Sequence, residues 1–203
     1  MTCHEEIADK LRAGERVVGW HLHKNGGGLV QDTAFVEDEA YIGERAQVCG
    51  SARVYGSARV YDSAQVCGSA RVYGSALVYD SARVCNSAQV CGSAQVYDSA
   101  RVGGSARVGG SAQVCGSARV ASPIDLIYVA HGRYGVTAYR DKDGVAWMCY
   151  GCELHQLKEW PKLHLKLARM HMPKDAAIYA RITREAAKFV AKMLPKAKKR
   201  ESK

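Results

Sequence analysis

The sequence predicts a mainly β protein built around a three-sided parallel β-solenoid, and two periodicities predict it. Residues 30–120 repeat a hexapeptide in which Val or Ile occupies every sixth position from Val30 to Val120, and Ala every sixth position from Ala34 to Ala118. Because Ala and the aliphatic residue are two positions apart, both point to one side of an extended strand and form its core face. A longer period of three hexapeptides relates the Tyr-Asp pairs at 61–62, 79–80 and 97–98.

Each hexapeptide is expected to form a short strand followed by a corner. The corner pair is mostly Gly-Ser, Asp-Ser or Asn-Ser, and Gly, Asp and Asn tolerate bent or left-handed backbone. If three hexapeptides make one turn, each residue stacks on the residue three hexapeptides later at about the 4.8 Å spacing of paired strands. Residues 30–119 then form about five coils. The alternative is that the longer period records only gene duplication.

The pattern V-x-G-S-A-x resembles the hexapeptide repeat of left-handed parallel β-helix proteins. This resemblance covers residues 30–120 and implies a left-handed coil. That fold carries acyltransferases, carbonic anhydrases and non-enzymatic scaffolds alike. The flanking segments HKNGGGLVQDTAFV (23–36) and YGVTAYRDKDGVAWMCYGCELHQLKEW (134–160) resemble phage- and prophage-encoded repeat proteins, and this second resemblance implies no particular activity.

The histidines argue against catalysis on the repeat. The resemblance implies that an acyltransferase would use a His of the β-helix as its general base, and that a carbonic anhydrase would bind zinc through several. Residues 30–120 contain no His, and no insertion interrupts the fifteen hexapeptides to shape a pocket. We therefore expect no catalytic residue and no cofactor. Acyl transfer from acyl-CoA is the enzymatic alternative, with His131 reaching back over the last coil.

The variable positions of the repeat are expected to stack into columns on the outside. One edge would carry Tyr61, Tyr79 and Tyr97, and another Tyr55 and Tyr73. Stacked aromatic pairs contribute about 0.5–1.5 kcal/mol each. These five tyrosines are the candidate subunit interface of a homotrimer, in which flat faces of the prisms pack together. A purely structural ladder is the alternative.

Two further columns carry groups with possible chemistry. The first contains Asp62, Asp80 and Asp98, and the second Cys49, Cys67 and Cys85. A like-charged column costs free energy unless a cation or Arg offsets it. Turn preference explains single Asp residues, and a calcium-type site is the alternative. The stacked thiols are close enough for disulfides, but we expect them to stay reduced in the cytosol.

The segments around the repeat are expected to be caps. Residues 1–29 predict a short helix and strand, because an uncapped solenoid would expose a strand edge and its core. The repeat stops at Pro123, which blocks further ladder pairing. Residues 121–160 predict a small α+β cap, with strands in IDLIYVA, YGVTAYR and GVAWMCY. Residues 161–203 predict a basic helical segment.

The α+β segment contains one cluster with metal-ligand spacing. Its members are Cys149, Cys152 and His155. A closed zinc site needs a fourth ligand, for which only His131, His164 and His171 lie near in the sequence. We expect ordinary buried Cys and no metal, with zinc as the alternative.

The formal charge of +9 is concentrated near the C-terminus, where residues 158–203 carry 14 basic and four acidic residues. An amphipathic helix is expected over 174–194, with an apolar stripe of Ile178, Ile182, Ala186, Phe189, Val190 and Met193. Clustered Lys and Arg displace counterions from phosphates. The candidate anion- or nucleic-acid-binding residues are Arg181, Arg184, Lys188, Lys192, Lys196, Lys198, Lys199 and Arg200. The alternative is a docked helix with a solvated basic face and a frayed tail.

From these features we expect a non-catalytic binding or scaffold protein of phage or prophage type, which assembles through the β-helix and binds an anionic or protein partner, a host factor among them. Acyl transfer, nucleic-acid binding and capture of an anionic small molecule at subunit junctions are the alternatives. The chain lacks a signal-like start and an apolar run of about 18 residues. We therefore expect it in the cytoplasm, that of the host if phage-encoded, with no membrane partner.

Overall fold

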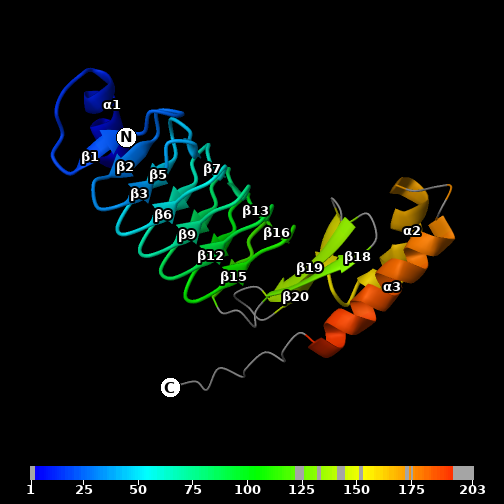
Figure 1. Cartoon of the computed structure of the whole chain (residues 1–203). Coiled ribbons are helices and arrows are strands. Elements are labelled where there is room, and N and C mark those ends of the chain that lie inside the picture. The colour runs from blue at the N-terminus through cyan, green and yellow to red at the C-terminus, as the bar shows by residue number, and fades with distance from the viewer. Residues whose placement is uncertain are drawn as a thin grey trace. The chain divides into compact units, whose positions relative to one another are not determined.

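The computed structural model describes residues 3–121, 126–131, 134–140, 145–150, 153–171, 174 and 176–193. The chain divides into two compact units, Met1–Pro123 and Ile124–Lys203 (Figure 1). The first unit contains the whole repeat. The second contains a small sheet and two helices.

The repeat forms a parallel β-solenoid with three faces (Figure 1). The first face consists of β2 (Leu29–Gln31), β5 (Gln47–Val48), β8 (Gln65–Val66), β11 (Arg83–Val84), β14 (Arg101–Val102) and β17 (Arg119–Val120). The second face consists of β3 (Phe35–Val36), β6 (Arg53–Val54), β9 (Arg71–Val72), β12 (Gln89–Val90) and β15 (Arg107–Val108). The third face consists of β4 (Tyr41–Ile42), β7 (Arg59–Val60), β10 (Leu77–Val78), β13 (Gln95–Val96) and β16 (Gln113–Val114).

Strands that lie three hexapeptides apart in the sequence pair in parallel and in register. Val30 is opposite Val48 on the first face, and Val78 is opposite Val96 on the third. Three hexapeptides therefore complete one turn, and the prediction of a three-sided solenoid with about five coils is confirmed. The left-handed sense of the coil stays a prediction.

The two invariant columns form the core of the solenoid. From Ala40 to Val120, every Ala and every Val or Ile of the two columns is at most 1% exposed. Burying a Val side chain contributes about 1.5–3 kcal/mol relative to leaving it in water. The repetition of a small and a branched residue thus gives every coil the same buried core.

The corners use the residue types that tolerate left-handed backbone. Asp62, Asp80, Asn86 and Asp98 have φ between 53° and 59°, and the matching corner positions from Gly50 to Gly116 are otherwise glycines with positive φ. At Gly104, with φ of 55°, an added Cβ would clash with the backbone oxygen of Ala121. The corner pairs are therefore required by backbone conformation and by close approach of successive coils.

The N-terminal segment forms the predicted helix and strand. Helix α1 (Cys3–Arg12) precedes β1 (Trp20–Leu22), which pairs antiparallel with β2 and places His21 opposite Val30. The Arg12 side chain donates a hydrogen bond from Nη2 to the Glu44 carbonyl at 2.6 Å. Strand β1 therefore covers the edge at which the first face would otherwise begin with unpaired backbone groups.

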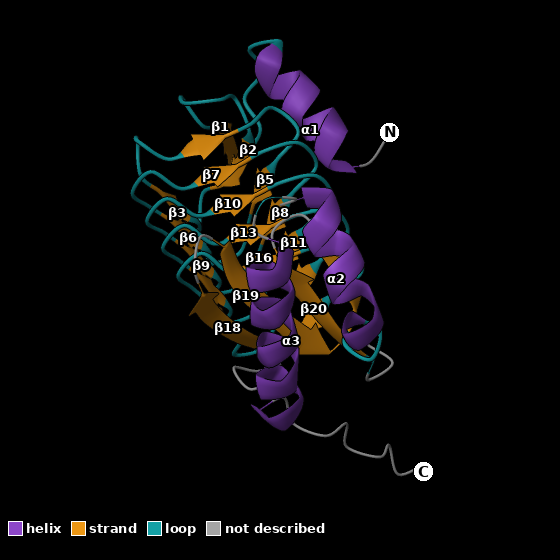
Figure 2. Cartoon of the chain, turned by 90° about the vertical axis from the view of Figure 1, so that its right-hand side faces the viewer, coloured by secondary structure: helices purple, strands orange, loops and turns teal. Residues whose placement is uncertain are grey.

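The second unit is an antiparallel sheet covered by helices (Figure 2). Its elements are β18 (Leu126–His131), β19 (Tyr134–Arg140), β20 (Ala146–Tyr150), β21 (Glu153–Gln156), α2 (Trp160–His171) and α3 (Ala176–Met193). Trp160 is buried and donates a hydrogen bond from Nε1 to the Met148 carbonyl at 3.1 Å. Val136, Ala138, Ala187 and Val190 complete this core.

Strands β18, β19 and β20 correspond to the three segments predicted from alternation, whereas alternation does not predict β21. Of the apolar stripe expected on α3, Val190 is buried and Ala186 is partly buried. The side chains of Ile178, Ile182, Phe189 and Met193 lie outside the described part of the structure. Among the described helices, none combines the length and the apolar character needed to cross a bilayer.

Candidate functional site

Two ladders of stacked tyrosines run along the solenoid. Tyr55 lies on Tyr73 with ring centroids 5.0 Å apart and planes 3° apart. Tyr61, Tyr79 and Tyr97 form the longer ladder, with 5.1 Å between centroids at each step. All five side chains are partly exposed. The ladders are therefore continuous aromatic strips that are partly open to solvent.

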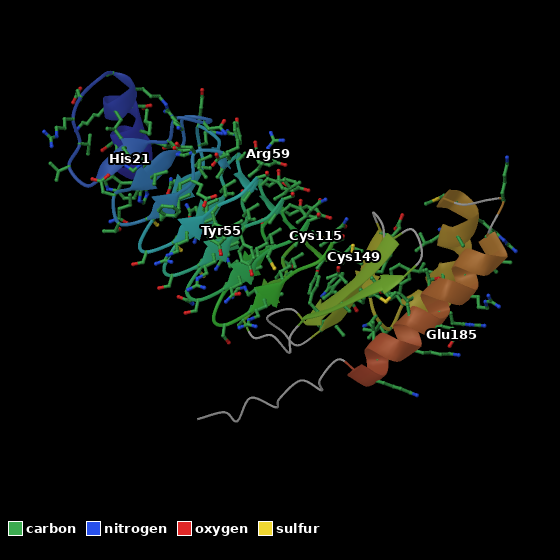
Figure 3. All side chains as sticks on the ribbon, in the orientation of Figure 1. His21, Tyr55, Arg59, Cys115, Cys149 and Glu185 are labelled. Atoms are coloured by element: carbon green, nitrogen blue, oxygen red, sulfur yellow. The ribbon has the colours of Figure 1, made fainter. Side chains whose placement is uncertain are left out.

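The ladders lie at the two corners that border the third face. Tyr55 and Tyr73 directly follow strands of the second face, at the corner that leads to the third, and Tyr61, Tyr79 and Tyr97 directly follow strands of the third face. Figure 3 labels Tyr55 and Arg59, which belong to one coil. The outward strand positions of the third face are Tyr41, Arg59, Leu77, Gln95 and Gln113.

The third face is the least charged of the three. Its single outward cation, Arg59, has its guanidinium carbon 5.1 Å from the centroid of the Tyr41 ring and 5.8 Å from that of Tyr61. The other two faces each carry three exposed arginines, namely Arg83, Arg101 and Arg119 on the first face and Arg53, Arg71 and Arg107 on the second. Depletion of charge and enrichment in tyrosine are features of interface cores in general.

Polar contacts hold the longer ladder in place. The Tyr79 hydroxyl donates a hydrogen bond to Gln95 Oε1 at 3.3 Å. Burial raises the pKa of Tyr79 to about 12, and the neighbouring Tyr61 and Asp80 add to the effect. Tyr79 therefore stays neutral well above physiological pH.

The aspartate column is a ladder of corner hydrogen bonds. In each step, Oδ2 of one aspartate accepts a hydrogen bond from the backbone N–H one coil further on. The distances are 3.4 Å from Asp80 N to Asp62, 3.2 Å from Asp98 N to Asp80, and 2.9 Å from Gly116 N to Asp98. The Nη2 atom of Arg45 lies 3.9 Å from Oδ1 of Asp62. Hydrogen bonds to a charged acceptor offset part of the repulsion between stacked carboxylates. Within the described residues, no group of three or more His, Cys, Asp or Glu has an arrangement that would hold a metal ion.

The cysteine column lies at the corner between the first and second faces. Cys49, Cys67 and Cys85 are free, partly exposed thiols. A hydrogen bond with Cys67 lowers the pKa of Cys49 to about 7 and raises the pKa of Cys67, while burial raises the pKa of Cys85. The column therefore places one readily ionised thiol at its N-terminal end.

Two histidines of the N-terminal segment are held in structural contacts. His21 Nδ1 lies 2.8 Å from Asp32 Oδ1 on the surface, and the buried His23 has its Nε2 3.0 Å from the Ala40 carbonyl oxygen. His131 ends β18, but its side chain lies outside the described ones. The structure thus adds no support to acyl transfer at the repeat.

Two of the three residues suggested for zinc lie on opposite sides of the small sheet. Cys149 is 3% exposed and pairs with Leu154, whereas His155 pairs with Met148, the neighbour of Cys149. Since adjacent residues of a strand point to opposite faces, Cys149 and His155 do not share a ligand position. Cys152 lies outside the described residues. His155 contacts Glu153 instead, with Nε2 and Oε2 2.8 Å apart.

Four of the predicted anion-binding residues lie along one side of α3. They are Arg181, Arg184, Lys188 and Lys192, and all four are exposed. Glu185, labelled on α3 in Figure 3, has its Oε1 3.0 Å from Lys188 Nζ and 3.7 Å from Arg184 Nε. The hydrogen bond from Lys188 lowers the pKa of Glu185. The other four predicted residues, Lys196, Lys198, Lys199 and Arg200, lie outside the described part of the chain.

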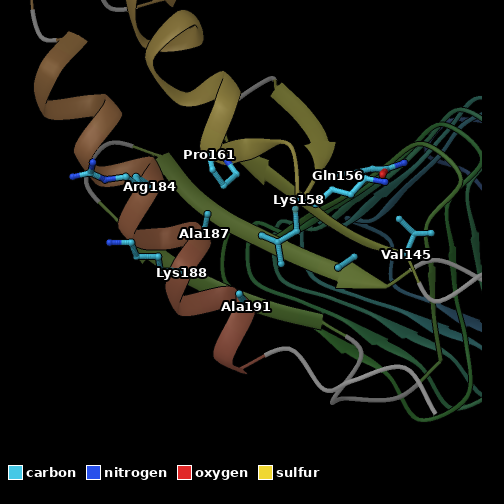
Figure 4. Close-up of a pocket in the computed structure, with 10 residues that line it drawn as sticks. Val145, Gln156, Lys158, Pro161, Arg184, Ala187, Lys188 and Ala191 are labelled. Atoms are coloured by element: carbon cyan, nitrogen blue, oxygen red, sulfur yellow. The ribbon is translucent and has the colours of Figure 1, made fainter. Parts of the chain in front are cut away.

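A cavity of about 650 Å³ opens within the second unit (Figure 4). It lies between the start of β20, the end of β21 and one side of α3. Its lining combines small apolar residues with Lys158, Arg184 and Lys188. No sequence pattern predicts this cavity, because it depends on how helix and sheet pack.

The fold and its surface columns define the class of a repeat β-solenoid protein. Residues 46–62 and 64–80 match the family described as the YdcK beta solenoid repeat. Both stretches lie within the solenoid, so this similarity concerns the repeat and not the second unit. Neither a curated protein nor a solved structure matches the chain.

Proposed function

We propose that the chain is a non-catalytic scaffold protein, which assembles into a homotrimer through the third face of its solenoid. In this proposal the trimer then presents its C-terminal units to an anionic or protein partner. The observation that carries the proposal is the position of the two tyrosine ladders at both edges of the least charged face.

Interface energetics support the third face over the other two. Tyrosine is among the residue types that dominate binding energy, because its ring buries a large area at little cost in side-chain entropy. Charged residues are depleted from interface cores. Packing either of the other faces would bury three arginines, for instance Arg83 above Arg101, with no acid from the same column to compensate them.

The placement of the ladders supports a ring of three. If three prisms turn their third faces toward a common axis, the Tyr55 edge of one protomer meets the Tyr61 edge of the next. This contact uses two different patches, and such heterologous contacts close into rings when the rotation permits.

The repeat itself supports a role without catalysis. Its corners have the regular geometry that Gly, Asp and Asn require, and residues 30–120 provide no His for proton transfer. Calorimetric titration with acetyl-CoA distinguishes a scaffold from an acyltransferase, because only the enzyme needs to bind this donor. Tight binding of acetyl-CoA by the full chain would overturn the non-catalytic proposal.

Static light scattering after size exclusion tests the assembly. The proposal expects a species of three chains of 22.1 kDa each. Addition of about 0.5 M salt is expected to leave this mass unchanged, because the contact is aromatic and apolar. A monomer at high micromolar concentration contradicts the proposal.

Nucleic-acid binding by α3 is a second candidate, which the four aligned cations favour. Three C-terminal units on one trimer would also raise avidity without new contacts. Retardation of DNA or RNA in a mobility-shift assay should weaken steeply between about 50 and 200 mM salt, and should not depend on nucleotide sequence. Loss of retardation in Arg181→Gln/Lys192→Gln would support α3 as the contact. No retardation by the wild type at low salt would refute this candidate.

A further inference from the structure

We infer that the cavity between β20, β21 and α3 is a binding site for a small organic anion with an apolar body. The site lies wholly within the second unit. The inference therefore goes beyond the proposed scaffold function and does not depend on assembly of the solenoid.

The size and lining of the cavity suit an apolar body. Its volume of about 650 Å³ lies in the range of small-molecule sites. The residues that form its apolar walls are Val145, Ala146, Leu157, Pro161, Ala187 and Ala191. Such walls favour an aromatic ring system or an aliphatic chain over a sugar or a free inorganic ion.

The space exists because α3 presents alanines to the sheet at this point. Ala187 is 6% exposed and belongs to the core with Val190, whereas Ala191, one turn later, is exposed. Longer side chains at these positions would fill the cavity. Figure 4 shows Ala187 and Ala191 on the side of α3 that borders it.

Three cations border the same cavity. Lys158 comes from the turn after β21, and Arg184 and Lys188 come from α3 (Figure 4). The lining is almost entirely apolar, so the aliphatic stems of Lys158, Arg184 and Lys188 form it and their charged ends lie outside it. Glu185 pairs with Arg184 and Lys188, which leaves a net positive charge beside the mouth of the cavity. Aliphatic stems of Lys and Arg commonly cover apolar surface while their charged ends stay in water. An anionic head group is therefore expected at the rim, with its apolar body inside.

The probe 1-anilinonaphthalene-8-sulfonate matches this chemistry, with a sulfonate and two aromatic groups. Fluorescence titration of the full chain should show saturable binding of one probe per chain. In Ala191→Trp, which fills the cavity, affinity should fall by about tenfold or more. Ala177→Trp is the matched control, because Ala177 is also exposed on α3 and does not line the cavity. It should keep affinity within about twofold of the wild type.

A pair of charge variants tests the anion. The double variant Arg184→Gln/Lys188→Gln should weaken probe binding by about fivefold or more at low salt. The control Arg181→Gln/Lys192→Gln removes the same charge elsewhere on α3 and should weaken probe binding by less than about twofold. If both double variants weaken probe binding equally, the effect comes from the overall charge of α3, and the proposed site is wrong. Circular dichroism checks that each variant is folded.

Competition keeps the inference testable if the cavity-filling variant does not fold. Dodecanoate should displace the probe from the wild type, whereas the neutral dodecanol should displace it at least about tenfold more weakly. Phosphatidylglycerol vesicles distinguish a bilayer from a free anion and should not displace it. Any one of three results would overturn the inference. They are the absence of saturable probe binding by the wild type, displacement of the probe by dodecanol alone, and displacement by vesicles alone.

Discussion

Tyr61 stacks on Tyr79 with ring centroids 5.1 Å apart and ring planes within 1° of parallel, although three hexapeptides separate them in the sequence. The same separation of three hexapeptides relates every pair of parallel strands in the solenoid. Each outward side chain of the inner coils therefore has a known neighbour above and below it. Substitutions in a column can be predicted from these two neighbours, as in other repeat proteins.

Breaking the longer tyrosine ladder at its centre should destabilise the solenoid. Tyr79→Ala removes two stacked pairs, those with Tyr61 and Tyr97, and should cost about 1–3 kcal/mol in the free energy of unfolding. Tyr79→Phe keeps both pairs and should cost less than half as much. Urea denaturation of the two variants measures the difference. Equal losses would show that the hydroxyl, and not stacking, carries the contribution.

The raised pKa of Tyr79 predicts a loss of stability at alkaline pH. The pKa of Tyr79 is about 12 in the folded chain, whereas the pKa of a tyrosine in an unfolded chain is about 10. Between these values the unfolded chain binds fewer protons than the folded chain, so stability contributed by neutral Tyr79 is complete below pH ~10 and is lost as pH rises toward ~12. The difference in phenolate absorbance between wild type and Tyr79→Phe gives this pKa. A midpoint near pH ~10 would contradict the prediction.

The Asp80 corner should discriminate backbone strain from the lost hydrogen bond. Asp80 has φ of 57°, and its carboxylate accepts the N–H of Asp98. Asp80→Asn keeps both features and should be nearly neutral. Asp80→Gly loses the hydrogen bond, about 1–2 kcal/mol, and adds about 0.5–1 kcal/mol of backbone entropy to the unfolded state. Asp80→Ala loses the same hydrogen bond and adds about 1–2 kcal/mol of left-handed strain. Thermal unfolding measures the order, and a glycine variant less stable than the alanine variant would contradict strain at this corner.

The cysteine column predicts selective modification of its first thiol. Because the hydrogen bond with Cys67 lowers the pKa of Cys49 to about 7, Cys49 should react with iodoacetamide faster than Cys85 at neutral pH. In Cys67→Ala the rate profile of Cys49 should shift upward toward an ordinary thiol pKa of about 8.5. Peptide mass spectrometry after timed alkylation follows each site. An unchanged pH profile in Cys67→Ala would rule out the proposed cause.

The solenoid could be predicted because its packing is one-dimensional. A period of three hexapeptides specifies that Val78 meets Val96, and the positive φ of Asp62 follows from its place in a corner pair. Sorting the outward strand residues by this period would also have found the low charge of the third face.

The side-chain contacts of the second unit could not be predicted, because they depend on tertiary packing that no local sequence pattern contains. Cys149 and His155 have the spacing of metal ligands, but the pairing register of β20 with β21 puts them on opposite faces of the sheet. Ala187 and Ala191 are ordinary residues of an amphipathic helix until the sheet beside them is known. The cavity is therefore a property of tertiary packing, and strand alternation or helical periodicity alone does not show it.

The proposed interface is tested most directly by sedimentation velocity on two matched variants. Leu77→Arg inserts a cation at the centre of the third face, and Gln89→Arg inserts one on the second face between Arg71 and Arg107. Leu77→Arg should dissociate the trimer into folded monomers of 22.1 kDa. Gln89→Arg should keep the trimer, although its like-charged neighbours should lower thermal stability by about 0.2–1 kcal/mol. A trimer that persists in Leu77→Arg, or one that is lost in Gln89→Arg, would contradict assembly through the third face.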